Sequence, residues 1–194
     1  MSKIGVFGGA FDPLHIGHLI IAERSIEEFK LQKIIFIPTN IPPHKPPPLA
    51  SALDRLELVK IAVQDKPYFE VSDMEIKRKG VSYWINTLRE LKKGYPKDEI
   101  FTLIGMDEAI YFMNWKEPEE ILKLSRFIII TRPESRGEVT SPLHEKADFI
   151  ELNLDISSTE IREHIRNGKS IKHLVPEEVE VYIKRKKLYK TYDL

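Results

Sequence analysis

The sequence predicts an α/β fold with a doubly wound parallel sheet. Short apolar, β-prone runs alternate with segments of helical periodicity along the chain, a pattern typical of strands joined through crossover helices. Such strands pair in parallel, with right-handed crossovers. A glycine pair also lies where the first strand should meet the first helix, at the sheet edge where open α/β folds bind their ligands. The length of 194 residues fits one domain, so we expect a single domain over residues 1–194.

Composition limits the classes of partner. The 30 lysine and arginine residues balance 30 aspartate and glutamate residues, so no net charge directs the protein to nucleic acid or to a membrane. With no cysteine, the chain can form neither a disulfide nor a cysteine-ligated metal site. No apolar run approaches the ~18 residues of a membrane helix, and the N-terminus leads straight into a strand rather than a signal peptide. We therefore expect a soluble, cytoplasmic protein that binds anions locally.

Six strands are predicted from apolar, β-prone runs. They span residues 4–7, 33–37, 68–71, 100–104, 126–131 and 148–152. Five helices are predicted from apolar residues at helical spacing, and they begin near residues 16, 51, 82, 156 and 176. Ser51 and Ser157 can cap their helices, Ser82 starts another, and Gly168 closes the fourth. The basic run 184–187 fits the C-terminal end of the last helix, which favours a solvated helix face over a nucleic-acid patch.

The stretch between the first strand and the first helix indicates a phosphate site. Gly8 and Gly9 lack Cβ atoms, so a ligand can approach the backbone closely and positive φ costs little. His15 and His18 are three residues apart and share one helix face, while Gly17 between them leaves room for a phosphate against the first turn. We expect the glycines to lie in the strand-to-helix turn, with free backbone N–H groups aimed at an anion.

Residues 38–48 are expected to form a stiff loop after the second strand. Six prolines in eleven residues exclude a helix or central strand and favour an extended, polyproline-like geometry. Such a loop loses little entropy if it holds Asn40, His44 and Lys45 toward a ligand. Its position beyond the carboxyl end of a strand favours that function, and a plain rigid connector is the alternative.

Two tryptophans and a carboxylate are each open to two interpretations. Trp84 lies in the first turn of the third helix, where packing is a more common role than a ligand platform. Gly105 and Asp107 follow the fourth strand, where Asp107 could bind a ribose hydroxyl or cap the next helix. Trp115 belongs to an aromatic cluster and could stack on a heteroaromatic ring or fill the core.

A second phosphate-like stretch opens the fourth helix. Ser157 and Glu160 fit a capping box, which would use two free amides of the helix start itself. The hydroxyls of Ser157, Ser158 and Thr159, the free N–H groups and Arg162 one turn later also describe a phosphate site. Both interpretations can hold together, and the two phosphate-friendly helix starts should share one sheet edge.

The segment before the last strand is less informative. Arg132 directly follows the carboxyl end of the fifth predicted strand. Residues 135–142 are polar, and we expect them to form a mobile connection.

Several of these segments resemble a known family. His15-Ile16-Gly17-His18 resembles the HxGH signature of the nucleotidyltransferase superfamily, and the stretch from Ile156 to Arg162 resembles its ISSTxIR motif. Further segments occur in the order seen in bacterial nicotinate-nucleotide adenylyltransferases; they are Gly8-Gly9-Ala10-Phe11-Asp12-Pro13, Pro42-Pro43-His44-Lys45, Ser82-Tyr83, Ile104-Gly105-Met106-Asp107 and Trp115. The match runs from residue 4 to about 185. It implies a Rossmann-like nucleotidyltransferase fold whose C-terminal helical part, about residues 156–187, completes the ATP site.

The resemblance implies adenylyl transfer from ATP to nicotinate mononucleotide, giving deamido-NAD and pyrophosphate in NAD biosynthesis. The attacking phosphate oxygen is already anionic, so catalysis rests on positioning and charge stabilisation rather than on a base or a covalent nucleophile. By this resemblance His15, His18 and Arg162 are catalytic. The implied ATP-binding residues are Gly8, Gly9, Ala10, Phe11, Gly17, Gly105, Asp107, Ser157, Ser158 and Thr159. Mg²⁺ is held mainly by the ATP phosphates, and no metal site on the protein is expected.

The resemblance also implies a site for the acceptor, nicotinate mononucleotide. Its implied residues are Asn40, His44, Lys45, Trp84, Trp115 and Arg132. The loop residues lie near the mononucleotide phosphate, Trp115 stacks on the pyridine ring, and the backbone N–H of Trp84 binds the nicotinate carboxylate. Two positions depart from the family pattern, since Trp84 and Ala10 stand where threonine is common. These departures bear on fine specificity rather than on the reaction class.

Three other functions fit part of the sequence. Pantetheine-phosphate adenylyltransferase shares the histidine and ISSTxxR motifs, but it is usually shorter and does not require the Pro-Pro-His-Lys loop. A class I aminoacyl-tRNA synthetase fragment is disfavoured because no KMSKS-like loop is present. A nucleotide-sensing module without turnover would be expected to have a damaged catalytic signature. No nucleic-acid or membrane partner is expected, and a homo-oligomer is compatible with the sequence.

Overall fold

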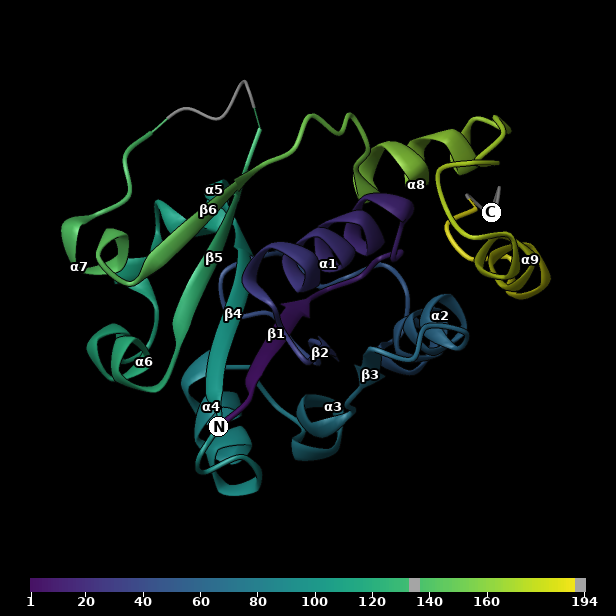
Figure 1. Ribbon diagram of the computed structural model, residues 1–194. Coiled ribbons are helices and arrows are strands. Elements are labelled where there is room, and N and C mark those ends of the chain that lie inside the picture. Colours follow the sequence, from purple (N-terminus) through teal and green to yellow (C-terminus); the bar gives the residue numbers. More distant parts are fainter. Residues whose placement is uncertain (133–136, 191–194) are drawn as a thin grey trace.

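The sheet has the predicted doubly wound, parallel architecture. The computed structural model describes residues 1–132 and 137–190 (Figure 1). Its six strands are all parallel, in the order β3-β2-β1-β4-β5-β6. They span Lys3–Gly9 (β1), Lys33–Pro38 (β2), Phe69–Val71 (β3), Glu99–Gly105 (β4), Arg126–Thr131 (β5) and Ala147–Glu151 (β6). The order reverses between β1 and β4, and in such sheets ligands bind beyond the carboxyl ends of the strands at this point.

All five predicted helices are present, together with short ones that the sequence did not reveal. The predicted helices are α1 (Ile16–Phe29), α2 (Ala52–Val63), α4 (Trp84–Gly94), α8 (Ser158–Arg166) and α9 (Glu177–Lys186). The additional ones are α3 (Met74–Arg78), α5 (Met106–Ala109), α6 (Pro118–Leu124), α7 (Ser141–His144) and the 3₁₀ turn Phe112–Asn114. Each of these has at most seven residues, too few to show helical periodicity. The predicted loop 135–142 is wrong at its end, because α7 begins at Ser141, and its residues 135 and 136 lie outside the described part of the chain.

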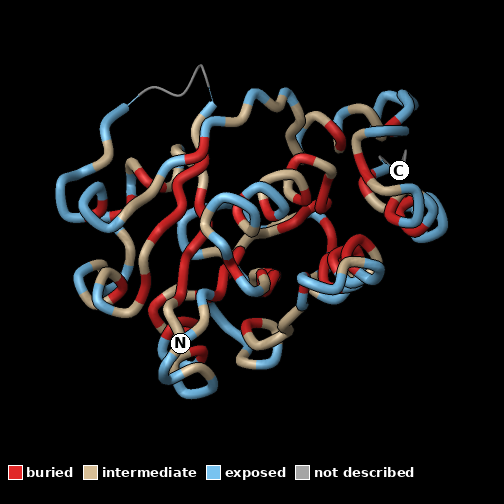
Figure 2. The backbone as a smooth tube through the Cα atoms, in the orientation of Figure 1, coloured by how far each residue is buried: buried red, intermediate tan, exposed pale blue. Residues whose placement is uncertain are grey.

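Two apolar layers bury the sheet, and adjacent strand residues alternate between them. Phe7 and Ile128 belong to the layer that contains residues of α1, α2, α8 and α9. Val6 and Ile129 belong to the layer that contains residues of α4, α6 and α7. The strands are consequently buried along most of their length (Figure 2). None of the described helices is long and apolar enough to cross a membrane.

Serine caps place two helix starts where the sequence predicted them. The Ser51 hydroxyl accepts the Asp54 N–H at the start of α2, and the Ser157 hydroxyl accepts the Glu160 N–H at the start of α8, both at 3.1 Å. The start of α4 differs, because Tyr83 is its N-cap and the helix begins two residues after Ser82. This shift places the backbone N–H of Trp84 at the first position of α4.

Candidate active site

The two glycines at the end of β1 accommodate aromatic rings rather than positive φ. Gly8 and Gly9 are the last residues of β1 and pair with the end of β2, so the expectation that they form the turn is wrong. Positive φ falls instead on Phe11, at 48°. A Cβ on Gly8 would lie 2.5 Å from the Trp84 ring, and one on Gly9 would lie 3.2 Å from the Phe11 ring. Close packing therefore needs glycine at position 8 and leaves little room for a side chain at position 9.

His15 and His18 lie together at the start of α1. His15 is the N-cap and His18 lies in the first turn, with 3.7 Å between ring centroids. The backbone N–H of His15 donates to Nδ1 of His18 at 3.2 Å. A Cβ on Gly17 would lie 3.0 Å from Nδ1 of His15, so Gly17 makes room for this imidazole. Nδ1 of His15 is buried and has no hydrogen-bond partner within the described residues, which leaves one polar atom available to a ligand.

The surroundings hold both imidazoles in the neutral form. Burial, followed by the positive charge of Arg132, lowers the pKa of His15 to about 4. Burial, followed by His15 and Arg132, also lowers the pKa of His18. Near pH 7 each ring can thus donate one N–H and accept at its other nitrogen. Arg132, which was predicted on the acceptor side, lies near this pair, with Nη2 3.5 Å from the Ile156 carbonyl oxygen.

Helix α8 is bound directly to the turn that follows β1. The Ser158 hydroxyl donates to the Pro13 carbonyl at 2.8 Å, and Nη1 of Arg162 donates to the Asp12 carbonyl at 2.7 Å. Figure 1 shows α8 beside the start of α1. The two motifs are about 145 residues apart in sequence, yet they form one continuous site.

Side-chain hydroxyls at the start of α8 are already engaged. Ser157 accepts the Glu160 N–H, Ser158 donates to the turn, and Thr159 accepts from Nη2 of Arg162 at 3.0 Å. The interpretation of three hydroxyls free for phosphate therefore needs correction. Backbone N–H groups remain instead, because those of Ser158 and Thr159 have no partner in the described part of the chain.

The proline-rich loop reaches across to α5. Both the backbone N–H and the side chain of Asn40 bind protein groups, the Ser82 hydroxyl at 3.0 Å and the Gly80 carbonyl at 2.9 Å. His44 is exposed. Lys45 Nζ lies 2.8 Å from a Glu108 carboxylate oxygen. Asn40 thus anchors the loop, while the exposed residues His44 and Lys45 lie further along it.

Both tryptophans pack against the protein. The Trp84 indole covers Gly8 and donates to the Thr102 hydroxyl at 3.2 Å, as the packing interpretation predicts. Its backbone N–H, at the start of α4, has no partner among the described residues. The Trp115 ring is half-buried, 5.5 Å from the Phe112 centroid, so it contributes to the core and still exposes part of its surface.

Asp107 does not cap the helix that follows β4. Gly105 is the N-cap of α5, and Asp107 lies in its first turn with its side chain 77 % exposed. The capping interpretation is thus wrong, and the carboxylate remains accessible to a ribose. A Cβ on Gly105 would lie 2.5 Å from a carboxylate oxygen of Asp107, so a larger residue there would displace this exposed side chain.

Sequence reasoning missed the buried residue Arg55 of α2. Its side chain is 1 % exposed, although arginine is rarely buried. A signal was present, because Arg55 precedes Leu58, Val59 and Ala62 by three, four and seven residues and so belongs to their apolar stripe. A charged residue on such a stripe indicates a buried polar network.

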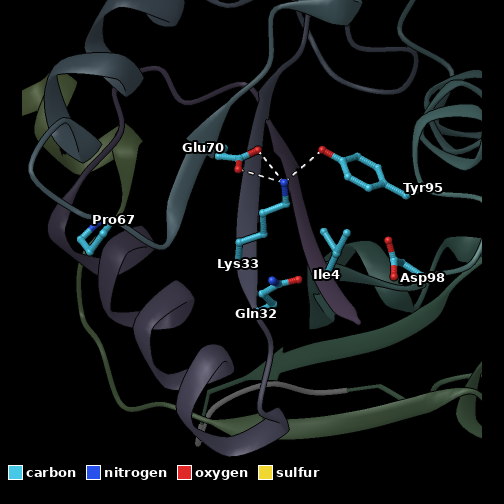
Figure 3. Close-up of a pocket in the computed structure, with 7 residues that line it drawn as sticks. All are labelled: Ile4, Gln32, Lys33, Pro67, Glu70, Tyr95 and Asp98. Atoms are coloured by element: carbon cyan, nitrogen blue, oxygen red, sulfur yellow. Dashed lines mark hydrogen bonds and ion pairs between the residues drawn. The ribbon is translucent and has the colours of Figure 1, made fainter. Parts of the chain in front are cut away.

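A hollow at the opposite sheet edge does not join this site. It lies at the amino ends of β1 and β2, among residues that include Lys33, Glu70 and Tyr95 (Figure 3). Nζ of Lys33 donates to both Glu70 carboxylate oxygens at 2.9 Å and to the Tyr95 hydroxyl at 3.1 Å. Its charge is thus already paired, which makes the hollow a poor anion site.

Comparison with known proteins identifies the family. Residues 6–164 match the model of the cytidylyltransferase-like family. A probable nicotinate-nucleotide adenylyltransferase of Desulfitobacterium hafniense (strain Y51) is 44 % identical, over 97 % of this chain and 96 % of the relative. One from Exiguobacterium sibiricum is 43 % identical, over 97 % of this chain and the whole relative. The chain therefore belongs to the nicotinate-nucleotide adenylyltransferases. This confirms the family that the motifs indicated.

Solved structures agree with the fold of this family. Nicotinic acid mononucleotide adenylyltransferase of Plasmodium falciparum, complexed with NaAD, superposes with a TM-score of 0.79. It is 19 % identical, and the match covers 97 % of this chain and 98 % of that one. The same enzyme complexed with APC gives a TM-score of 0.78. At this identity the likeness supports the fold.

Proposed function

We propose that the protein transfers the adenylyl group of ATP to nicotinate mononucleotide. An oxygen of the mononucleotide phosphate forms a bond to the α-phosphorus, and the bond from that phosphorus to pyrophosphate breaks, leaving deamido-NAD. The observation that carries this proposal is the joining of α8 to the turn before the histidine pair, through Ser158 and Arg162. It gathers neutral imidazoles, a guanidinium and free N–H groups at one edge of the sheet, where they can bind a triphosphate.

The ATP side of the site supplies donors. In this proposal His18 contacts the α-phosphate, and His15 and Arg162 stabilise the charge that develops on the departing pyrophosphate. The N–H groups of Ser158 and Thr159 have no partner among residues 1–132 and 137–190, which supports a phosphate contact there. We extend the same role to the backbone after β1 and to the other predicted ATP contacts, Gly8, Gly9, Ala10, Phe11, Gly17, Gly105, Asp107 and Ser157. Because the attacking oxygen is anionic, no residue needs to remove a proton.

The acceptor side is formed by the proline-rich loop and the start of α4. We propose that His44 and Lys45 bind the mononucleotide phosphate, that Trp115 stacks on the pyridine ring, and that the Trp84 N–H binds the carboxylate. The free N–H at the helix start supports the last contact, because helix N-termini favour anions. Arg132 and Asn40 complete the predicted set, Asn40 by anchoring the loop.

Magnesium enters this proposal with ATP. In the described part of the chain no group of three or more histidine, cysteine, aspartate or glutamate side chains could hold a metal ion. The phosphates would be its main ligands, where it would neutralise their charge. A single domain over residues 1–194, with residues 156–187 completing the ATP site, and a cytoplasmic location are parts of the same proposal.

Pyrophosphate release tests the function. The protein is incubated with MgATP and nicotinate mononucleotide, nicotinamide mononucleotide or phosphopantetheine in turn. We expect the highest kcat/KM with nicotinate mononucleotide. A higher value with phosphopantetheine would assign the pantetheine reaction, ATP binding without turnover would indicate a nucleotide sensor, and equal values for the two mononucleotides would show that the acid is not selected.

A variant pair tests the role of the histidine at the α-phosphate. His18→Ala should lower kcat about 10²- to 10³-fold, the usual effect of losing one transition-state donor, while ATP binding falls less. His144→Ala removes an exposed histidine on α7 and is the matched control. Unchanged turnover in His18→Ala would contradict the assignment.

A further inference from the structure

Arg55 binds four backbone carbonyls from three segments around the site. Nη1 donates to Ala10 at 2.6 Å, in the turn after β1. Nη2 donates to Thr39 at 2.6 Å and to Asn40 at 3.2 Å, where the proline-rich loop begins. Nε donates to Ala50 at 3.3 Å, where that loop ends. One buried guanidinium therefore connects the phosphate turn to both ends of the loop.

Asp12 makes a second connection between the same segments. Its carboxylate is 5 % exposed and accepts the backbone N–H groups of Leu49 at 2.7 Å and Ala50 at 3.0 Å. The Tyr189 hydroxyl also donates to this carboxylate, at 2.9 Å. Because the carbonyl of Asp12 accepts from Arg162, this residue joins the loop, the turn and α8.

The loop between these anchors has few fixed contacts of its own. Most of residues 41–48 are exposed, and among the described residues Lys45 pairs with Asp107 and Glu108 at the surface. The Ile41 carbonyl accepts the Ser82 N–H at 2.8 Å, so the placement of His44 and Lys45 relative to the histidine pair depends on the anchors at residues 39–41 and 49–50. In-line transfer needs the attacking oxygen about 3–3.5 Å from the phosphorus, and a misplacement of about 1 Å can cost 10²-fold in rate.

We propose that Arg55 and Asp12 are positioning residues, which hold the acceptor loop at a fixed place relative to the phosphate turn. The inference rests on the proposed function. Burying a guanidinium is costly unless its donors are satisfied, and a hydrophobic residue would serve a purely structural role at lower cost. Only a planar fork with five donors can bind carbonyls in several directions at once, so lysine is not equivalent at this position.

The test compares Arg55→Lys with Leu58→Val. Leu58 is buried on the same helix, and its side chain cannot form hydrogen bonds. Its variant therefore lowers stability without altering the anchors. Both are assayed with MgATP and nicotinate mononucleotide at a temperature where their melting curves show only folded protein. We expect Arg55→Lys to lower kcat about 10²-fold. The affinity of MgATP alone, measured by calorimetry, should change less than threefold, and Leu58→Val should keep the wild-type kcat.

Other variants decide the question if Arg55→Lys does not fold. Asp12→Asn removes an acceptor from the second connection and should also lower kcat more than it lowers MgATP affinity. Tyr189→Phe removes one hydrogen bond of that connection and should give a smaller loss of the same kind. Folded variants with kcat within threefold of wild type, or losses that follow stability alone as in Leu58→Val, would overturn the proposal. A wild type inactive toward nicotinate mononucleotide would refute the proposed function instead, and the variants would then be compared on the acceptor it does use.

Discussion

Acidification should destabilise the protein through His15, by an amount that follows from its burial. The pKa of His15 is 6.5 in an unfolded chain and about 4 in the folded protein. Since the folded value is lower, the unfolded state binds the proton more readily. The contribution of His15 to the free energy of unfolding is fully present above pH 6.5 and is lost as pH falls toward 4. Between about pH 7.5 and about pH 5 this linkage removes about 2 kcal/mol of unfolding free energy.

Urea unfolding of wild type and His15→Asn, followed by tryptophan fluorescence across this pH range, measures the loss. Asparagine is neutral throughout and is a favourable N-cap residue, so the variant keeps the helix start and removes the titration. We expect its unfolding free energy to fall about 2 kcal/mol less than that of wild type on acidification. His144→Asn, at an exposed position, is the control and should follow the wild-type curve. Parallel curves for wild type and His15→Asn would refute the reasoning.

Three further substitutions test packing, the loop and a buried carboxyl group. Gly8→Ala should lower stability by about 1–3 kcal/mol, because its Cβ meets an indole at 2.5 Å. Gly94→Ala should not lower stability, because no atom lies within 4 Å of its Cβ. Thermal melting of the two variants measures the difference. Lys45→Ala should raise the KM for nicotinate mononucleotide, whereas Glu108→Gln, which breaks the same ion pair, should not; equal effects would show that only the pair matters. Burial raises the pKa of Glu75, so wild type loses stability as pH rises from 4.5 through the folded value. Glu75→Gln should lack this loss in denaturant titrations, and an identical pH dependence would contradict it.

The fold could be predicted because its main elements are long and regular. Strands such as residues 126–131 are continuous apolar runs, as buried parallel strands require, and α1 begins where it was predicted, at Ile16. The four-residue helices α5 and α7 could not be found, because one turn gives no periodicity and their residues form helix through tertiary contacts. The β1 boundary was misplaced for a related reason. Gly8 and Gly9 are poor strand formers, and their pairing with β2, together with the packing of Trp84 on Gly8, keeps them extended.

The position of the site was predictable, while its internal contacts were not. Motif spacing placed His15, His18 and Arg162 at one edge of the sheet, where the structure has them. Sequence could not show that the hydroxyls of α8 are used by the protein, because their partner at Pro13 is 145 residues away. Arg55 was overlooked although its place on the apolar stripe of α2 was a signal. Its four acceptors are backbone carbonyls, which every residue type carries, so the sequence does not identify them.

The tryptophan at position 84 joins the end of β1 to the start of α4 through packing. A threonine in its place could not cover Gly8, whereas the indole fills the space above that residue and is fixed by Thr102. Since Trp84 is also the first residue of α4, the direction of its N–H depends on the same contacts. A change at Gly8 should thus reach the start of α4. The space above Gly8 therefore accommodates a bulky residue at the position where the family resemblance predicts threonine.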